Sequence, residues 1–382
     1  MKIKHLKNIC IISLGLAFSL SSCSNDDKED VTAPVIPTEE NKVATPATYE
    51  FTRLGNSTVD YSGQTSRLNQ LTELTAEMKK ADAGSSISAA TLKDMFANQN
   101  NPFSQVYSKD LKSKTFALDV DYFEDLMDQM GALSGITTSA SNGTAGLMTR
   151  ASGATILVDS NGRELTQLIE KGLMGATLYN QIVNTYLTED KIGRTVDNDA
   201  IDTANGNYYT TMEHHFDEAF GYMGFPVDFS SNYNGSGVIS FWGKYSNTAD
   251  DNIQMNDRLM NAFKRGRAAI TAKEYAVLDE EVNKLYEELE VMIAATTIYY
   301  INQTISLANA GDRHHALSEA YAFLRALRYS NASKRKINQA DITDMLENRI
   351  GNNFYNTTAT NLNFIKNTLS AAYGLDSVKD QL

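Results

Sequence analysis

The sequence contains very few cysteines and prolines. Only two of its 382 residues are cysteine, Cys10 and Cys23, and both lie near the N-terminus. The region from residue 49 onward therefore has no thiol for a disulfide, a cysteine nucleophile or a cysteine-based metal site. That region also has only two prolines, Pro102 and Pro226, and this scarcity permits long helices.

The local patterns of several common enzyme classes are also missing. No Gly-x-Gly-x-x-Gly follows a strand pattern and opens a helix, and no Walker loop is present, so nothing supports nucleotide binding. The sequence has neither a Gly-x-Ser-x-Gly nucleophile elbow nor a His-Glu-x-x-His zinc-peptidase helix. The net charge is −13 and the one basic run, 334–336, is short, which argues against nucleic acid as a partner.

Residues 1–22 have the pattern of a lipoprotein signal peptide. Three lysines precede an apolar run at 9–20, which is too short to span a membrane and ends in the sequence LSSC. Small residues before a cysteine resemble the bacterial lipobox. This resemblance implies cleavage before Cys23 and acylation of Cys23, so we expect the chain to contact the membrane through this lipid anchor.

Residues 23–48 are expected to form a disordered tether after the acylated cysteine. They begin with the acidic tract SNDDKED and contain three of the five prolines of the chain. An acidic tract in this position resembles the export signal of Bacteroidetes-type surface lipoproteins. The resemblance implies a lipid-anchored protein of the outer membrane, exposed at the cell surface.

Residues 49–382 are expected to form an all-α domain. Apolar residues recur at helical spacing in several segments, for example 67–80 and 118–133, and Ser88 is a candidate helix cap. The helix pattern of 163–187 contains two glycines, which indicate close helix approach. A strand or hairpin is expected near 154–162, and the segments at 134–153 and 232–247, the latter with the only tryptophan, are expected to be loops.

Two distant segments share one pattern. HHFDEAFGY at 214–222 and HALSEAYAF at 315–323 align with a shift of 101 residues, as His-x-x-x-Glu-Ala-aromatic-small-aromatic. The match suggests a duplicated helical unit with one copy in each half, 49–231 and 232–382. If both helices face one core, the two His–Glu pairs converge.

The spacing within each copy predicts a metal site. Histidine and glutamate three or four residues apart lie on one face of a helix, and imidazole with carboxylate suits zinc or iron. A His–Glu pair at this spacing is also a common hydrogen bond within a helix, and an aromatic stripe is usually core, so the structural interpretation stays open. The candidate metal ligands are His214, His215, Glu218, His315 and Glu319, with Tyr222 and Tyr321 as additional contacts; no catalytic residue is assigned.

His215-x-x-Glu218 resembles the core of the Gly-x-His-x-x-Glu signature of imelysin-like proteins, although Glu213 stands where the signature has glycine. Those proteins are all-helical, two-bundle proteins of bacterial envelopes, linked to iron uptake and once classed as metallopeptidases. Other stretches, including ILVDSNGRELTQLIEKGLMGA and FWGKYSN, resemble a Bacteroidetes lipoprotein family of unassigned function, and this likeness runs through most of 49–380.

These observations favour a binding protein over an enzyme. The hypothesis is an envelope lipoprotein that binds a metal, iron above all, or a metal-bearing ligand such as haem, together with envelope partners of an uptake system. One alternative is an interaction or scaffold lipoprotein without small-molecule chemistry. A second is an imelysin-type metallopeptidase, but no general base is evident in the sequence.

Overall fold

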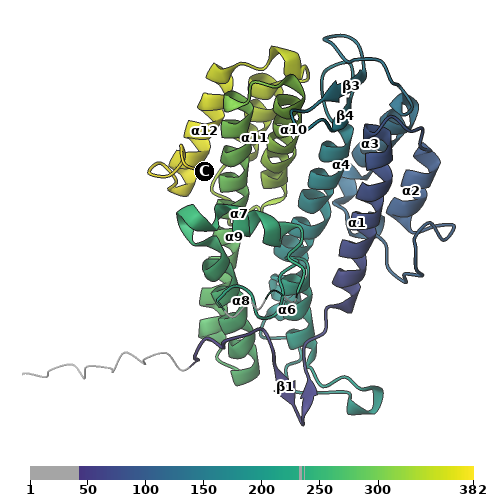
Figure 1. Cartoon of the computed structure of the whole chain (residues 1–382). Coiled ribbons are helices and arrows are strands. Elements are labelled where there is room, and N and C mark those ends of the chain that lie inside the picture. The colour runs from purple at the N-terminus through teal and green to yellow at the C-terminus, as the bar shows by residue number, and fades with distance from the viewer. Residues whose placement is uncertain (1–42, 232–234, 236) are drawn as a thin grey trace, which may run out of the picture. The chain divides into compact units, whose positions relative to one another are not determined.

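The computed structural model describes residues 43–231, 235 and 237–382, which are mostly helical (Figure 1). The strands of this part form two antiparallel hairpins, so the predicted all-α fold with a minor hairpin is confirmed. The strands are β1 Thr52–Arg53, β2 Asn56–Ser57, β3 Gly146–Thr149 and β4 Thr155–Val158. The α-helices are α1 Ser62–Asp82, α2 Ala89–Ala97, α3 Val120–Leu133, α4 Leu165–Leu173, α5 Glu189–Ile192, α6 Thr211–Gly221, α7 Trp242–Ile253, α8 Met255–Ala272, α9 Tyr275–Ser306, α10 Ala310–Ala326, α11 Gln339–Asp344 and α12 Ala359–Tyr373.

The long helix α9 packs against α8, α10 and α12. Its residues 289–298 are all buried, and they include two threonines. Thr296 and Thr297 donate hydrogen bonds of 2.8 Å to the carbonyl oxygens of Met292 and Ile293, so their hydroxyl groups are satisfied within the helix. None of the described helices combines the length and the apolar character needed to cross a membrane.

The helix expected over 163–187 is present as α4, which continues into wider helical turns at Met174–Tyr179 and Ile182–Tyr186. Its glycines allow the predicted close approach. A Cβ atom on Gly175 would lie 2.7 Å from the Cβ of Ala326 in α10. α4 of the first expected half and α10 of the second therefore pack directly against each other.

The expected strand near 154–162 is β4, and its partner β3 comes from the segment 134–153 that was expected to be a loop. The hairpin is attached to the end of α1, because the Asp82 carboxylate accepts a hydrogen bond of 3.0 Å from the backbone N–H of Leu157. Serine, threonine and glycine dominate 134–153, so local composition did not reveal this strand.

The expectation of a loop over 232–247 is wrong in its second part, because α7 begins at Trp242. The indole is fully buried and its Nε1–H donates to the carbonyl oxygen of Met174 at 3.2 Å. Its ring also contacts Tyr245 and Phe323. Glycine and asparagine around the helix start mark a loop in sequence, but packing of the indole against α4 and α10 outweighs that preference.

The segment 43–59 is held against α6 and α8 by buried polar groups. The Tyr49 hydroxyl donates to Asp217 at 2.8 Å, and the Arg53 guanidinium pairs with Glu213. Arg267 of α8, which has no exposed surface, donates to Asp217 at 2.8 Å and to Glu213 at 2.9 Å. This cluster fixes the start of the folded region to the helix that carries the first His–Glu motif.

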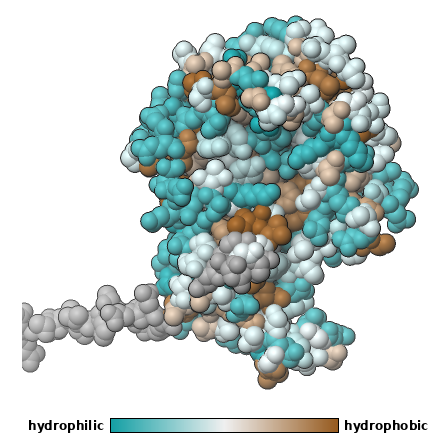
Figure 2. Space-filling view, viewed as in Figure 1, coloured by the Kyte–Doolittle hydropathy of each residue, from teal (hydrophilic) through white to brown (hydrophobic). Residues whose placement is uncertain are grey.

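The surface in Figure 2 is mostly hydrophilic, and hydrophobic residues are scattered over it apart from one patch near the centre of this face. The large apolar side chains with the most exposure are isolated in the sequence, for example Leu54, Val106 and Leu118. Single exposed apolar residues are normal on soluble surfaces, so they do not by themselves mark a functional site.

Candidate functional site

α6 begins at a capping box. The Thr210 hydroxyl accepts a hydrogen bond from the backbone N–H of Glu213, and the Glu213 carboxylate accepts one from the backbone N–H of Thr210 at 2.9 Å. Burial alone would raise the pKa of Glu213, but its hydrogen bond to Arg53 and the charge of Arg267 lower that pKa to about 2. Glu213, which stands where the imelysin-like pattern has glycine, is thus a buried carboxylate that is paired with Arg53 and Arg267.

The two histidines of α6 already have close neighbours. The ring of His214 stacks on Tyr209 with centroids 4.6 Å apart. His215 Nδ1 lies 2.7 Å from the backbone oxygen of Lys191, and its Nε2 lies 3.5 Å from Lys191 Nζ. Because an ammonium group repels a cation, this lysine disfavours a metal ion at His215 Nε2.

Glu218 of α6 is bonded to protein groups. It accepts hydrogen bonds from Gln64 Nε2 at 3.0 Å and from the Tyr186 hydroxyl at 3.1 Å. Tyr222 is buried beside Tyr186, and burial raises its pKa well above the ordinary value, which keeps the phenol protonated. The α6 motif therefore links α6 to its neighbouring helices.

The α10 motif has a different environment, formed together with α4. His315 Nδ1 lies 2.7 Å from Glu164 Oε2, and His315 Nε2 lies 3.9 Å from Glu319 Oε2. Lys171 Nζ lies 2.9 Å from Glu170 Oε2 and 3.7 Å from Glu319 Oε1. The packing of α4 against α10 thus brings three carboxylates, an imidazole and an ammonium group together.

Burial changes the proton affinity of these groups. Burial raises the pKa of Glu319, against the lowering effect of Lys171 and His315. Burial and the nearby Glu164 raise the pKa of Asp82 to about 7. For His315 burial favours the neutral ring, but the hydrogen bond to Glu164 and the charges of Glu164 and Glu319 outweigh it and raise the pKa. The imidazolium form is therefore favoured by its carboxylate neighbours.

The structure does not bring the two motifs together. α6 packs against α1, α5 and α8, whereas α10 packs against α4 and α9, and Figure 1 shows α6 in the lower and α10 in the upper part of the helical body. In the described ranges, no three His, Cys, Asp or Glu side chains are grouped so that they could hold a metal ion.

A cavity of about 850 Å³ opens beside the α10 motif. It is bordered by α1, α4, α7, α10 and the β3–β4 hairpin. We call five of its polar side chains, contributed by α4 with its N-cap residue and by α10, the cavity floor; four of them are buried and His315 is partly buried. The floor consists of Glu164, Gln167, Lys171, His315 and Glu319.

Three buried acceptor atoms in this cavity have no hydrogen-bond partner among the described residues. They are Thr75 Oγ1, Gln167 Oε1 and Glu319 Oε2, and each of these residues is at most 5% exposed. A buried polar atom without a partner costs on the order of 1 to 3 kcal/mol. Each of these three atoms has less than 1 Å² of accessible surface, so it is enclosed by protein and does not face the open space of the cavity.

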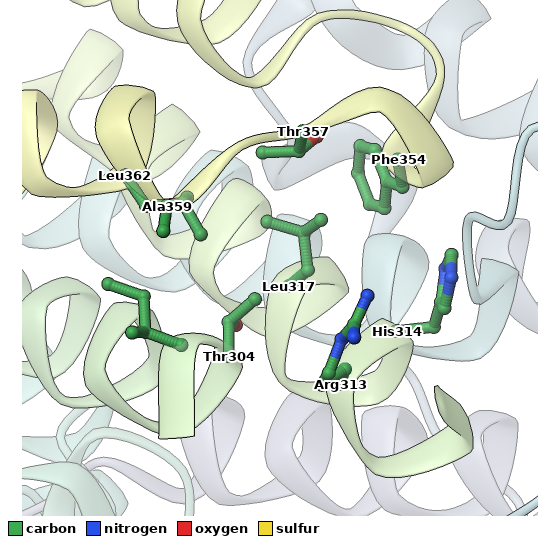
Figure 3. Close-up of a pocket in the computed structure, with 9 residues that line it drawn as sticks. Thr304, Arg313, His314, Leu317, Phe354, Thr357, Ala359 and Leu362 are labelled. Atoms are coloured by element: carbon green, nitrogen blue, oxygen red, sulfur yellow. The ribbon is translucent and has the colours of Figure 1, made fainter. Parts of the chain in front are cut away.

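A smaller cavity of about 190 Å³ borders the start of α10 (Figure 3). Arg313 and Leu317 lie below Phe354 and Thr357, and His314 stands at the edge. His314 Nδ1 lies 2.7 Å from the carbonyl oxygen of Gly162, so this histidine attaches α10 to the turn before α4. It plays no part in the cavity floor.

Several residues of the cavity floor were missed by the sequence prediction. Glu164, Gln167 and Lys171 recur at i, i+3 and i+7, which places polar groups on one face of an apolar helix and is the signal that could have found them. Tyr321 packs against Phe354, while Tyr300 of α9 lies near Glu319, whose charge adds to the effect of burial in raising the pKa of Tyr300. The predicted tyrosine is thus replaced by one from another helix.

Comparison with known proteins gives a family assignment but no function. No curated protein and no solved structure matches this sequence. A family model with the description "Domain of unknown function (DUF4856)" matches residues 46–376, which cover both His–Glu motifs and every residue of the cavity floor. The chain therefore belongs to the DUF4856 family.

Proposed function

We propose that this protein is a binding protein whose cavity floor holds the positively charged group of a small ligand. The observation that carries the proposal is the group of carboxyl, imidazole and ammonium side chains that the packing of α4 against α10 brings together at one cavity. The volume of about 850 Å³ lies within the range of small-molecule sites.

The carboxyl groups of the cavity lie in its interior. Four carboxyl groups and five basic side chains line the whole cavity, but two of the basic residues, Lys79 and Lys244, are exposed. In the interior, Lys171 and His315 each lie within 4 Å of two carboxylates. The carboxyl groups that line the cavity are Asp82, Glu164, Glu170 and Glu319.

An ammonium group fits the cavity floor better than a metal ion does. A metal centre normally takes at least three protein ligands, whereas only His315 Nε2 and Glu319 Oε2 face each other here, 3.9 Å apart. The Glu164–His315 hydrogen bond is the kind that orients a metal-binding imidazole. The Lys171 ammonium group, 3.7 Å from Glu319, repels a metal ion and an ammonium group alike, so the number of available ligands is what separates the two. Of the predicted iron ligands, only His315 and Glu319 of α10 lie at this cavity. Metal binding at these two residues is the alternative in the test.

The test compares the same change, glutamate to glutamine, in the α10 motif and in the α6 motif. We expect alaninamide, a cation without a carboxylate, to raise the melting temperature of residues 24–382, since a ligand that binds only the native state stabilises it. Glu319→Gln is expected to remove this shift and Glu218→Gln to retain it, because Glu319 lines the cavity whereas Glu218 does not line it and accepts hydrogen bonds from Gln64 and Tyr186.

The same assay is run with Fe²⁺, Zn²⁺ and Ni²⁺. A shift with a metal ion alone, lost in Glu319→Gln, would replace the ammonium interpretation by the metal interpretation. A shift lost in Glu218→Gln but not in Glu319→Gln would place the site at α6. If none of these probes changes the melting temperature, the proposal is wrong.

We further propose that the protein acts at the cell envelope, as a lipid-anchored outer-membrane protein. Support comes from the lipobox-like LSSC and the acidic tract after it, which lie outside the described residues. Cys23→Ala is expected to move most of the protein from the membrane fraction to the soluble fraction, because the acyl chains attach to this residue. Immunoblotting of fractionated cells measures this, and an unchanged membrane fraction would refute the anchor.

A further inference from the structure

We infer that the smaller cavity at the start of α10 binds a small carboxylic acid with an apolar side group, and that the Arg313 guanidinium holds the carboxylate. We call this cavity the Arg313 site; its residues come from the end of α9, from α10 and from the segment 354–362. None of them lines the larger cavity, so the Arg313 site is separate from the one in the proposed function.

The Arg313 site offers positive charge and no negative charge. Among the described residues that line it there is neither aspartate nor glutamate, although the net charge of the chain is −13. The Arg313 side chain is exposed and has no ion pair or hydrogen bond with a described residue, and the neighbouring Asp312 is paired with Arg150 at 2.7 Å. Burial lowers the pKa of His314 and the charge of Arg313 adds to this effect, so the neutral imidazole is favoured. An anion is therefore the charge that this site can pair.

The guanidinium is also the one side-chain donor of the described lining that is not already used. The hydroxyl groups of Thr304 and Thr357 donate hydrogen bonds of 2.7 and 2.9 Å to backbone carbonyl oxygens. His314 Nδ1 lies 2.7 Å from the carbonyl oxygen of Gly162, so a neutral ring has its hydrogen there and an acceptor at Nε2. A carboxylate accepts two parallel hydrogen bonds from a guanidinium, so Arg313 is where it would bind.

The other side chains of the site are mostly apolar. In Figure 3 the Arg313 side chain extends from α10 toward Phe354 and lies beside Leu317. Leu317, Phe354 and Leu362 are each 3% exposed, so an apolar group that contacts them would be removed from water. A ligand with a carboxylate next to an apolar group matches this combination of one cation and an apolar lining.

The size of the Arg313 site limits the ligand. A cavity of about 150 Å³ holds a benzene ring, so the volume of about 190 Å³ suits on the order of six to nine non-hydrogen atoms. A branched five-carbon acid or benzoate has this size. Acetate is too small to cover the apolar side chains.

The experiment is a saturation-transfer NMR titration of residues 24–382 with benzoate, isovalerate and acetate. Benzoate and isovalerate are expected to bind with dissociation constants on the order of 0.1 to 1 mM, which is reasonable for ligands of this size. Acetate is expected to bind at least tenfold more weakly, because it buries almost no apolar surface. Benzamide, the uncharged match of benzoate, is also expected to bind at least tenfold more weakly, because the charge-assisted hydrogen bonds are lost.

Three variants test the place of binding. Arg313→Met is expected to weaken benzoate at least tenfold and to leave benzamide unchanged, because it removes the charge at an exposed position. Arg328→Met is the matched control, since Arg328 does not line the site, and it is expected to bind benzoate like the unaltered protein. Ala359→Phe is expected to weaken benzoate and benzamide alike, because Ala359 lines the site and the added ring occupies part of it.

Several results would overturn the inference. They are equal binding of benzoate and benzamide, equal binding of benzoate and acetate, equal weakening by Arg313→Met and Arg328→Met, no effect of Ala359→Phe, or no binding of either benzoate or isovalerate. Alaninamide is expected not to displace benzoate, because the two cavities share no residue. The titration therefore decides the Arg313 site whether or not alaninamide binds at the cavity floor.

Discussion

Replacing Arg267 with methionine is expected to lower the free energy of unfolding by about 3 to 5 kcal/mol. The guanidinium is fully buried and pairs with the buried carboxylates of Asp217 and Glu213. Methionine fills much of the volume, but it leaves both carboxylates without their shared cation. Urea unfolding followed by far-ultraviolet circular dichroism measures the change.

Arg258→Met on the same helix is the control for Arg267→Met. Arg258 is 38% exposed and pairs with Glu288, so its loss is expected to cost less than about 1 kcal/mol. Adding Asp217→Asn to Arg267→Met is expected to recover part of the stability, because the carboxylate that has lost its cation is then neutral, whereas Glu213 keeps Arg53 as a partner. Equal losses for the two arginine variants would show that the buried ion pairs contribute little.

Trp242→Ala is expected to lower the free energy of unfolding by about 3 to 5 kcal/mol, as for other large-to-small core changes. The indole is fully buried, contacts the rings of Tyr245 and Phe323, and donates a hydrogen bond to Met174. Its removal leaves a cavity between α7, Phe323 of α10 and the turn that begins at Met174. Circular dichroism is the appropriate probe, because the substitution removes the only tryptophan.

Trp242→Phe separates packing from the hydrogen bond. It retains an aromatic ring and loses the Nε1–H donor, so we expect a loss of about 1 to 2 kcal/mol. If Trp242→Ala lowers the free energy of unfolding by less than about 3 kcal/mol, the indole does not fix the start of α7. It would also weaken the assignment of Lys244, two residues later, to the cavity.

Periodicity predicted the fold well where one helix face is buried. Leu71, Leu74 and Met78 of α1 are fully buried as their spacing indicated, and Ser88 caps α2 by accepting a hydrogen bond from the backbone N–H of Thr91. Strand β3 and the start of α7 were missed because their residues have no local preference for these structures. Trp242 is placed by contacts with residues more than sixty positions away.

The candidate site was predicted only in part. The pattern identified His315 and Glu319, which lie in the cavity, but it gave equal weight to His215 and Glu218, which are bonded to neighbouring helices. The two motifs are alike in sequence and differ in what packs against them. Because Glu164 and the other α4 residues meet α10 only in the folded chain, no spacing rule within one helix distinguishes the motifs.

The attachment of segment 43–59 to α6 and α8 has a mechanical consequence. When a protein is held at its N-terminus, a pulling force acts first on the earliest residues that are fixed in the folded body. Here those residues include Tyr49 and Arg53, whose bonds to Asp217 and Glu213 would resist the pull before it reaches α1. The cavity formed by α1, α4, α7 and α10 would then keep its geometry under tension.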